Sequence, residues 1–206
     1  MKSLTTIAGI LGALFFIIAS ILGGAQIEGY SLVSQYISES YANGLPDTQY
    51  LRYMYITSGV LLVIFGFTAA SSLSQLKGIK IGFFLFAIFY GLGTITTGYF
   101  PCDMGCNPDP EVATLSQFIH NTAGFLVYAV VPFCLLGIGF SSKKIESATS
   151  FSKTSIICGS LALCFVVFLF GNPTGPYIGL FQRIIEVSIL FWVIYVALYI
   201  ERTNNQ

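Results

Sequence analysis

Six apolar segments, each about as long as a lipid bilayer is thick, constrain the fold of this chain more than any other feature. A hydrocarbon core of about 30 Å requires about 20 apolar residues in a helix. The segments lack the alternation of barrel strands, so helices alone satisfy their backbone groups in lipid. We therefore predict an all-α integral membrane protein, a six-transmembrane-helix bundle in the lipid bilayer that forms a single transmembrane domain over residues 1–206. The predicted spans are residues 7–26, 51–73, 81–101, 118–140, 154–171 and 179–200, and the predicted outer loops are residues 27–50, 102–117 and 172–178.

The composition agrees with lipid as the main solvent of the chain. Hydrophobic residues make up 55% of it and charged residues only 9%, whereas soluble proteins carry about 25% charged residues. Nine basic residues balance nine acidic residues. The chain therefore has no net positive charge that would attract a nucleic acid, and we expect no nucleic-acid partner. The sequence also contains no Walker-type phosphate loop, G-x-S-x-G elbow or H-E-x-x-H helix.

The basic residues in the loops indicate the orientation of the bundle. Lys and Arg concentrate in loops that stay in the cytoplasm, which predicts a multi-pass protein of the cell membrane with N- and C-termini cytoplasmic. The first span could instead be a cleaved secretory signal, but its run of about nineteen residues exceeds the usual 7 to 15 of a signal core, so we expect the chain to retain it. The predicted inner side holds Lys2, Lys77, Lys80, Lys143, Lys144, Lys153 and Arg202, and the outer side holds Arg52 and Arg183.

Two cysteines follow the third span in the sequence YFPCDMGC. An outer loop permits oxidation, so a disulfide between Cys102 and Cys106 is the favoured interpretation, with free thiols and a zinc site as alternatives. A zinc site would take its ligands from Cys102, Cys106, His120 and Asp103. Because His120 is the only histidine in the chain, we expect no haem held between two histidines.

His120 is expected near the outer boundary of the hydrocarbon. The sequence Asp109-Pro110-Glu111 has the N-cap and first-turn residues of a helix start, so we predict that the fourth helix begins near Pro110. Ten residues at 1.5 Å each then carry His120 about 15 Å along the helix, with Asn121 beside it. An ionisable ring and an amide would thus lie at the outer face of the bundle.

The last span carries three polar residues within its first two turns. Gln182, Arg183 and Glu186 lie in a stretch that must cross lipid, where a charge costs about 2.5 to 3.5 kcal/mol on insertion scales. We expect these residues to face the bundle interior, with Arg183 reaching Glu186 at i, i+3. The predicted constellation can be a structural network of ion pairs, a ligand or substrate pocket, or a metal site. Its members are Glu39, Arg52, Asp103, His120, Asn121, Gln182, Arg183 and Glu186.

The first outer loop is rich in tyrosine, with six of the twelve tyrosines between Tyr30 and Tyr55. Tyr30, Val33, Ile37 and Tyr41 recur at helical spacing, which predicts a short helix on the outer membrane face. Tyrosines at an interface ordinarily form an aromatic belt. The alternative is that this segment forms a lid over the polar pocket.

Several short motifs resemble a known family. They are Ile37-Ser38-Glu39 after the first span, Phe100-Pro101-Cys102-Asp103 with Gly105-Cys106 after the third, His120 in the fourth, and Gln182-Arg183 with Glu186 in the sixth. Together, and over nearly the whole chain, they resemble the uncharacterised prokaryotic six-span family called domain of unknown function 998. Ser40-Tyr41 departs from the Leu-Gly that often follows the Ser-Glu pair in that family. The resemblance implies six helices and supplies no activity, substrate or cofactor.

Three functional hypotheses follow from these residues. The first is binding or transport of a small molecule or lipid headgroup in an outward-facing pocket, with Arg52 and Arg183 contacting an anion and His120 and Glu186 exchanging a proton. The second is an intramembrane lipid hydrolase in which Asp103, His120 and Glu186 hold a metal or act as acid and base. The third is a structural or assembly protein whose charges only stabilise the bundle. The remaining ligand-binding candidates are Glu39, Asn121 and Gln182.

Overall fold

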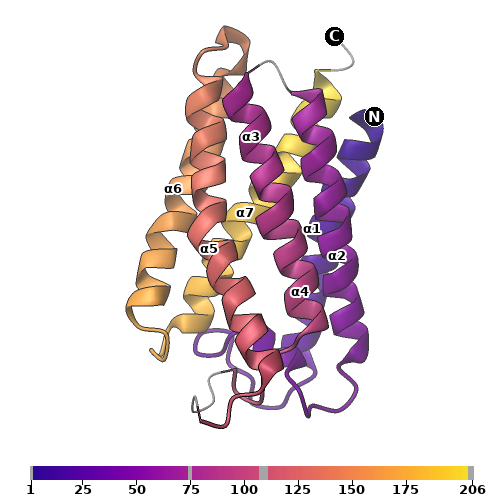
Figure 1. The fold of residues 1–206 in the computed structure, drawn as a ribbon, viewed down its shortest axis with the longest axis vertical. Helices are drawn as coiled ribbons and strands as arrows, with labels where there is room; N and C mark the ends of the chain where they lie inside the picture. Colours follow the sequence, from indigo (N-terminus) through magenta and orange to yellow (C-terminus); the bar gives the residue numbers. More distant parts are fainter. Residues whose placement is uncertain (1, 74–75, 107–110, 204–206) are drawn as a thin grey trace.

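The chain folds into six long helices that pack side by side (Figure 1). The computed structural model describes residues 2–73, 76–106 and 111–203, and within these ranges it contains helices and no strand. All six are long and apolar enough to cross a membrane, which agrees with the predicted all-α bundle. Five spans are single helices: α1 (Lys2–Ala25), α2 (Gln49–Ser72), α5 (Leu115–Ser142), α6 (Thr149–Gly171) and α7 (Ile178–Arg202). The third span along the chain consists of α3 (Lys77–Phe86), η2 (Ala87–Leu92) and α4 (Gly93–Tyr99), which follow one another without a break. Two short 3₁₀ helices, η1 (Ile37–Tyr41) and η3 (Glu146–Ala148), lie between spans.

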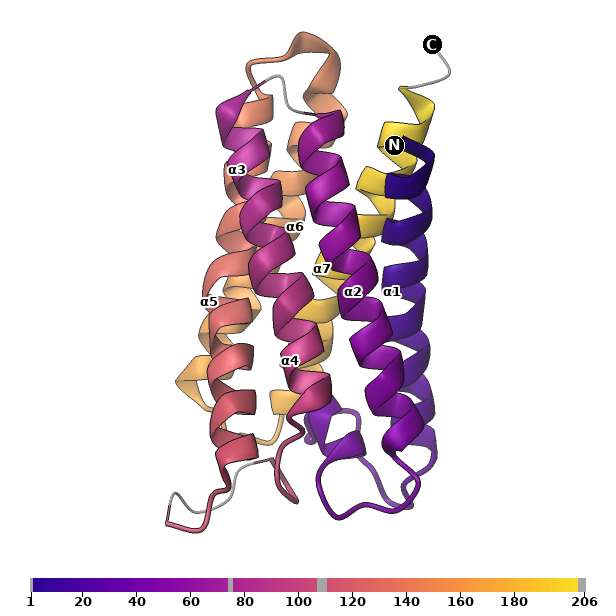
Figure 2. The same cartoon turned by 45° about the vertical axis from the view of Figure 1, so that its right-hand side comes forward.

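The six spans form a closed ring around one core. α1 packs against α2 and α7, the third span packs against α2 and α5, and α6 packs against α5 and α7. The start of α1 and the end of α7 lie at one end of the bundle, with the link from α5 to α6, and we call this the terminal end (Figures 1 and 2). The links from α1 to α2 and from α6 to α7 lie at the opposite end, which we call the loop end.

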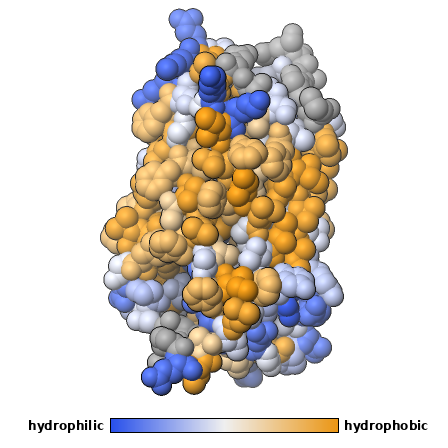
Figure 3. All heavy atoms as spheres, viewed as in Figure 1, coloured by the Kyte–Doolittle hydropathy of each residue, from blue (hydrophilic) through white to orange (hydrophobic). Residues whose placement is uncertain are grey.

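The outer surface around the middle of the bundle is apolar. Large hydrophobic side chains point outward from several spans, among them Ile21 of α1, Phe118 of α5 and Val187 of α7, which are 64%, 67% and 65% exposed. Figure 3 shows this hydrophobic surface between two more hydrophilic ends. A water-soluble protein covers such side chains, so lipid is the environment of this surface.

Aromatic side chains fill the interior toward the terminal end. Trp192 of α7 is fully buried, and its ring lies 5.6 Å from that of Phe83 and 5.3 Å from that of Phe86, measured between centroids. The indole Nε1 donates to the Ser155 hydroxyl of α6 at 2.9 Å. These contacts join three spans and leave the polar side chains described below in the half of the bundle near the loop end.

The third span contains one π-helical turn, η2, which holds Tyr90. α2 approaches this turn so closely that a Cβ on Gly59 would lie 2.7 Å from the Gly91 carbonyl oxygen, so glycine lets the two backbones touch. π-helical turns inside α-helices occur frequently at functional sites. Here the turn belongs to the wall of the polar interior.

The prediction that the fourth helix begins near Pro110 is wrong. α5 begins at Leu115, because the Thr114 hydroxyl accepts a hydrogen bond from the Gln117 backbone N–H at 3.1 Å and caps the helix. Asp109 and Pro110 themselves lie outside the described residues. The helix therefore starts only five residues, about one and a half turns, before His120.

The predicted short helix in the first outer loop forms over only part of that stretch. η1 is helical over Ile37–Tyr41, as a 3₁₀ helix, and turns precede it. The preceding residues lie against the start of α7, where the Leu180 N–H donates to the Val33 carbonyl at 2.9 Å. A Cβ on Gly179 would clash with the Gln35 carbonyl oxygen. Contact with α7 therefore takes the place of the internal hydrogen bonds of an α-helix.

Candidate functional site

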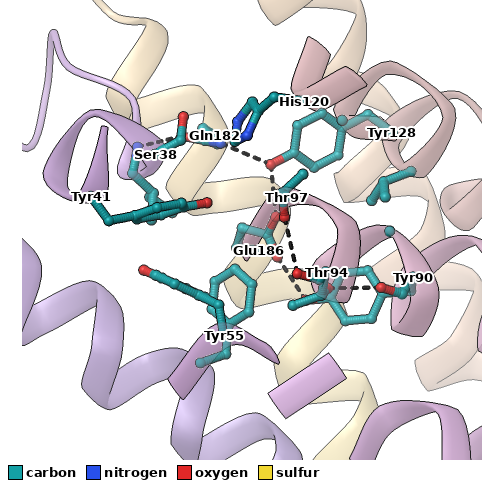
Figure 4. Close-up of a pocket in the computed structure, with 15 residues that line it drawn as sticks. Ser38, Tyr41, Tyr55, Tyr90, Thr94, Thr97, His120, Tyr128, Gln182 and Glu186 are labelled. Carbon is teal, nitrogen blue, oxygen red and sulfur yellow. Dashed lines mark hydrogen bonds between the residues drawn. The ribbon is translucent and has the colours of Figure 1, made fainter. Parts of the chain in front are cut away.

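Glu186 is the centre of the polar interior. Its Cα lies about 12 Å along α7 from the first residue of that helix, and the side chain is only 6% exposed. One carboxylate oxygen accepts from the Tyr90 hydroxyl and the other from the Tyr128 hydroxyl, both at 2.7 Å (Figure 4). Among the described residues, no Lys or Arg side chain pairs with this carboxylate. Two neutral donors on the third and fourth spans therefore hold a buried acid on the sixth.

The proton positions in this network follow from Gln182. The Ile37 backbone N–H donates to Gln182 Oε1 at 2.6 Å, so the amide nitrogen of Gln182 must be the group that donates to the Tyr128 hydroxyl at 3.0 Å. The Tyr128 proton is then directed to Glu186. Both carboxylate oxygens accept O–H groups, which suits an ionised carboxylate.

A cavity of about 60 Å³ lies beside Glu186, and we call it the chamber. The tyrosines of the network line it, together with Tyr41 of η1 and Tyr55 of α2 (Figure 4). The Tyr55 side chain is 1% exposed, and its buried hydroxyl has no hydrogen-bond partner. Buried polar groups ordinarily have a partner, so this hydroxyl is available to a molecule in the chamber.

A second cavity, the vestibule, adjoins the chamber and has a volume of about 200 Å³. The two share Ser38, His120, Tyr128 and Gln182 in their walls. The vestibule continues toward the loop end, where Asn121 lies in its wall. The chamber is thus approached through polar side chains from that end of the bundle.

His120 lies between the chamber and the vestibule. Its Nδ1 is 2.9 Å from the Phe100 carbonyl oxygen, which only accepts, so Nδ1 carries a hydrogen. In the neutral ring Nε2 is then a hydrogen-bond acceptor. The Tyr41 ring lies 6.3 Å from the imidazole, between centroids.

A disulfide joins Cys102 to Cys106 beside the vestibule, as the favoured interpretation of the sequence has it. Cys102 Sγ lies 3.5 Å from the Ser38 carbonyl oxygen, and Cys106 Sγ lies 3.2 Å from the Ser38 hydroxyl oxygen. The Gln117 amide of α5 donates to the Cys106 carbonyl at 3.0 Å. The disulfide loop therefore packs η1 against the start of α5.

Asp103 is placed outside the chamber. Its carboxylate accepts from the Thr114 backbone N–H at 2.9 Å and from the Thr114 hydroxyl at 2.8 Å. The hydrogen bond from the Thr114 backbone has the largest effect on the pKa of Asp103. Together with the bond from the hydroxyl, it lowers this pKa below its ordinary value. Asp103 stabilises the helix start and lies apart from His120 and Glu186.

Arg183 also departs from its predicted role, because it does not pair with Glu186. Its Nη1 donates to the carbonyl oxygens of Leu32 and Gln35, each at 2.8 Å, and its Nη2 donates to the Tyr30 hydroxyl at 2.8 Å. The guanidinium compensates loop carbonyl groups that no helix satisfies, which is why it turns away from the acid.

Two further candidates hold the loop end together. Arg52 donates to the Gly98 carbonyl at 3.2 Å and to the Tyr99 carbonyl at 2.9 Å, at the end of α4. Glu39 accepts from the Tyr36 backbone N–H at 2.8 Å. Of the eight predicted residues, the structure therefore brings His120, Gln182 and Glu186 to the chamber and Asn121 to the vestibule. Residues 2–73, 76–106 and 111–203 contain no group of three or more His, Cys, Asp or Glu side chains that could hold a metal ion.

The tyrosines inside the spans are the site residues that the sequence analysis missed. Tyr90 and Tyr128 lie many residues from the ends of their helices, too deep for an interfacial belt. A buried acid needs donors at its own depth, and this requirement was the signal that could have identified them. Burial also raises the pKa of Tyr41, in η1, above its ordinary value.

The comparisons with known proteins identify a family and no function. A family model described as "Protein of unknown function (DUF998)" matches residues 10–199. No curated protein and no solved structure matches the chain significantly. Function must therefore be inferred from the site.

Proposed function

We propose that this chain, which belongs to the DUF998 family of proteins of unknown function, binds a small molecule or a lipid headgroup in the chamber beside Glu186. One observation carries the proposal: a buried carboxylate with no basic partner among the described residues shares a cavity with a buried Tyr55 hydroxyl that has no partner. A ligand in the chamber would satisfy both groups.

A purely structural network explains this arrangement less well. Breaking or leaving open a buried polar network costs more than replacing it with apolar side chains. A structural pair would also use Arg183, which lies one turn from Glu186 and instead contacts loop carbonyl groups. The unpaired hydroxyl and the adjoining vestibule favour a site that a ligand completes.

Binding is favoured over transport through the bundle. The rings of Phe83, Phe86 and Trp192 pack together between the chamber and the terminal end, and all three are fully buried. A ligand would have to displace these rings to pass. The hydrolase hypothesis retains His120 and Glu186 as chamber residues and has no support for Asp103 as their partner.

The distribution of basic residues supports an outward-facing chamber. Lys77 and Lys80 start α3, Lys143 and Lys144 follow α5, and Arg202 ends α7, so these residues belong to the terminal end. Because Lys and Arg concentrate on the cytoplasmic side, we assign the terminal end to the cytoplasm of a multi-pass cell-membrane protein. The vestibule then opens on the outer side.

Native mass spectrometry of the full chain, released from membranes in mild detergent, tests the binding function. We expect the wild-type protein to retain a non-covalent ligand, and Glu186→Gln and Tyr55→Phe to lose it. Glu146→Gln, which changes an exposed acid at the terminal end, is the matched control and should retain the ligand. Equal retention by all four proteins, or a wild-type protein with no ligand, would contradict the proposal.

A further inference from the structure

We infer that the ligand is a lipid whose headgroup carries a primary ammonium, with the ammonium in the chamber at Glu186 and the hydrocarbon chain in a groove between α1 and α7. The inference rests on the proposed function and names the ligand class of the same site. It follows from the hydrogen-bonding character of the chamber, its charge, and the groove that meets it.

The polar atoms that the chamber offers to a ligand are mostly acceptors. The hydroxyls of Thr94 and Thr97 donate to backbone carbonyl oxygens at 2.7 and 3.2 Å, so their oxygen lone pairs remain. His120 uses Nδ1 as a donor to another carbonyl and leaves Nε2 as an acceptor. The Glu186 carboxylate only accepts. An ammonium group has three donors and no acceptor, and it complements this surface.

The charge and the rings of the chamber also favour a cation. Glu186 is its only acidic residue, and no Lys or Arg belongs to the described residues that line the chamber or the vestibule. Aromatic rings line the chamber together with the carboxylate, and Tyr55 lies 4.6 Å from Tyr41 and 5.1 Å from Phe16, between ring centroids. The faces of such rings attract a cation within about 6 Å. The chamber therefore neutralises a positive group by a carboxylate and by rings together.

The hydrogen-bonding character of the chamber selects the kind of ammonium. Its free polar atoms are mostly acceptors, and a primary ammonium brings three N–H donors to them. A trimethylammonium has no N–H group and would leave these acceptors without a donor. The site should thus prefer ethanolamine-type headgroups to choline-type headgroups.

An apolar groove meets the chamber on the side of α1 and α7. It has a volume of about 570 Å³, and Phe16, Ile37 and Glu186 line both the groove and the chamber. Ile21 and Val187 also line the groove and belong to the lipid-facing surface described above. A lipid lying in the groove can therefore reach Glu186 with its headgroup while its chain stays in contact with the membrane.

Arg183 adds a second point of charge complementarity, for a phosphate. It lines the groove three residues before Glu186, which is about 4.5 Å along the helix. Its Nη1 and one Nη2 hydrogen contact the loop, which leaves Nε–H and the other Nη2 hydrogen without a partner among the described residues. Arginine suits phosphate recognition. In an aminophospholipid, two carbons separate the phosphate oxygen from the ammonium, so one headgroup carries a partner for each of these two residues.

The test measures lipid binding to the purified full chain by native mass spectrometry. The probes are dioleoyl phosphatidylethanolamine, phosphatidylcholine and phosphatidylglycerol, which share their chains and differ in headgroup. Because one charge-assisted hydrogen bond corresponds to about a tenfold change in affinity, we expect the ethanolamine lipid to bind at least about tenfold more tightly than the other two. Glu186→Gln should abolish this preference while Glu146→Gln preserves it.

A second pair of variants tests the groove without touching the acid. Val187→Trp fills the groove from the lipid side and should weaken binding of the ethanolamine lipid. Leu198→Trp, an exposed position of the same helix outside the groove, should leave it unchanged. Ethylammonium chloride supplies the same ammonium without a hydrocarbon chain and should bind much more weakly than the lipid.

Each contrary result overturns a different part of the inference. Equal binding of the ethanolamine and choline lipids, both lost in Glu186→Gln, would refute the primary ammonium and keep the binding function. Tight binding of ethylammonium that Val187→Trp does not change would show that the ligand is a soluble amine. Binding of every probe unchanged in Glu186→Gln would refute both the inference and the proposed function.

Discussion

Replacing Tyr128 with phenylalanine tests the network around Glu186 directly. The hydroxyl accepts from the Gln182 amide at 3.0 Å and donates to the carboxylate at 2.7 Å, and the ring that packs in the core is unchanged by the substitution. The variant therefore leaves two buried polar groups each with one hydrogen bond fewer. We expect it to be less stable than the wild-type protein by an amount that these two bonds determine.

Membrane double-mutant cycles set the size of this effect. Side-chain hydrogen bonds between membrane helices average about 0.6 kcal/mol and reach about 1.7 kcal/mol. If the amide bond has the average strength and the carboxylate bond has the upper value, Tyr128→Phe costs about 2.3 kcal/mol. Tyr90→Phe removes only a carboxylate bond and should cost about 1.7 kcal/mol. Tyr53→Phe, whose side chain is 59% exposed, should cost almost nothing.

Reversible unfolding in mixed micelles of detergent and sodium dodecyl sulfate, followed by circular dichroism, measures these free energies. The same Tyr128 substitution made in a Glu186→Leu background should cost only about 0.6 kcal/mol, because the carboxylate bond is already absent. The reasoning fails if Tyr128→Phe is as stable as Tyr53→Phe. It also fails if the cost is the same in both backgrounds, since the tyrosine would then act independently of the acid.

Three further predictions concern the loop end. Gly179→Ala should displace the first loop and speed its cleavage by an added protease, because the new Cβ clashes with a loop carbonyl; unchanged cleavage would contradict the packing. The lowered pKa of Asp103 means that its contribution is complete above the ordinary carboxyl pKa and lost as pH falls through the folded value. Acid should therefore lower the protection of the amides at the start of α5 against hydrogen exchange, relative to the intrinsic exchange rate at each pH, in the wild-type chain and not in Asp103→Asn. Thiol counting of the denatured chain should find two thiols, those of Cys102 and Cys106, only after reduction, and their detection before reduction would refute the disulfide.

The architecture could be predicted from the sequence because a bilayer allows few solutions. Segments of spanning length must be helices when no strand alternation is present, and short links place consecutive helices side by side. The loop end could not be predicted in the same way. The position where α5 starts depends on Thr114 and on its contact with Asp103, and the conformation before η1 depends on contacts with α7. Such contacts between distant residues leave no periodic pattern in the sequence.

The site was predictable where a polar residue had to be buried. Gln182 and Glu186 stand out because ionisable and amide groups are costly inside a span, and the structure brings both to the chamber. The partners were harder to identify, since Arg183 satisfies the spacing for an ion pair with the acid and yet contacts the loop. Tyr90 and Tyr128 resemble ordinary apolar positions until the depth of the acid is known.

The choice of partners for Glu186 is the strongest argument for a ligand. The chain has a cation within one turn of this acid and directs it to backbone carbonyl groups, so the negative charge is held by hydroxyl groups and is not neutralised. A buried charge in this state is expensive and gains most from a positive group that enters the chamber. Gln182 also joins the carboxylate network to the Ile37 backbone of η1. A ligand that binds Glu186 would therefore stabilise both the interior of the bundle and the loop that closes over it.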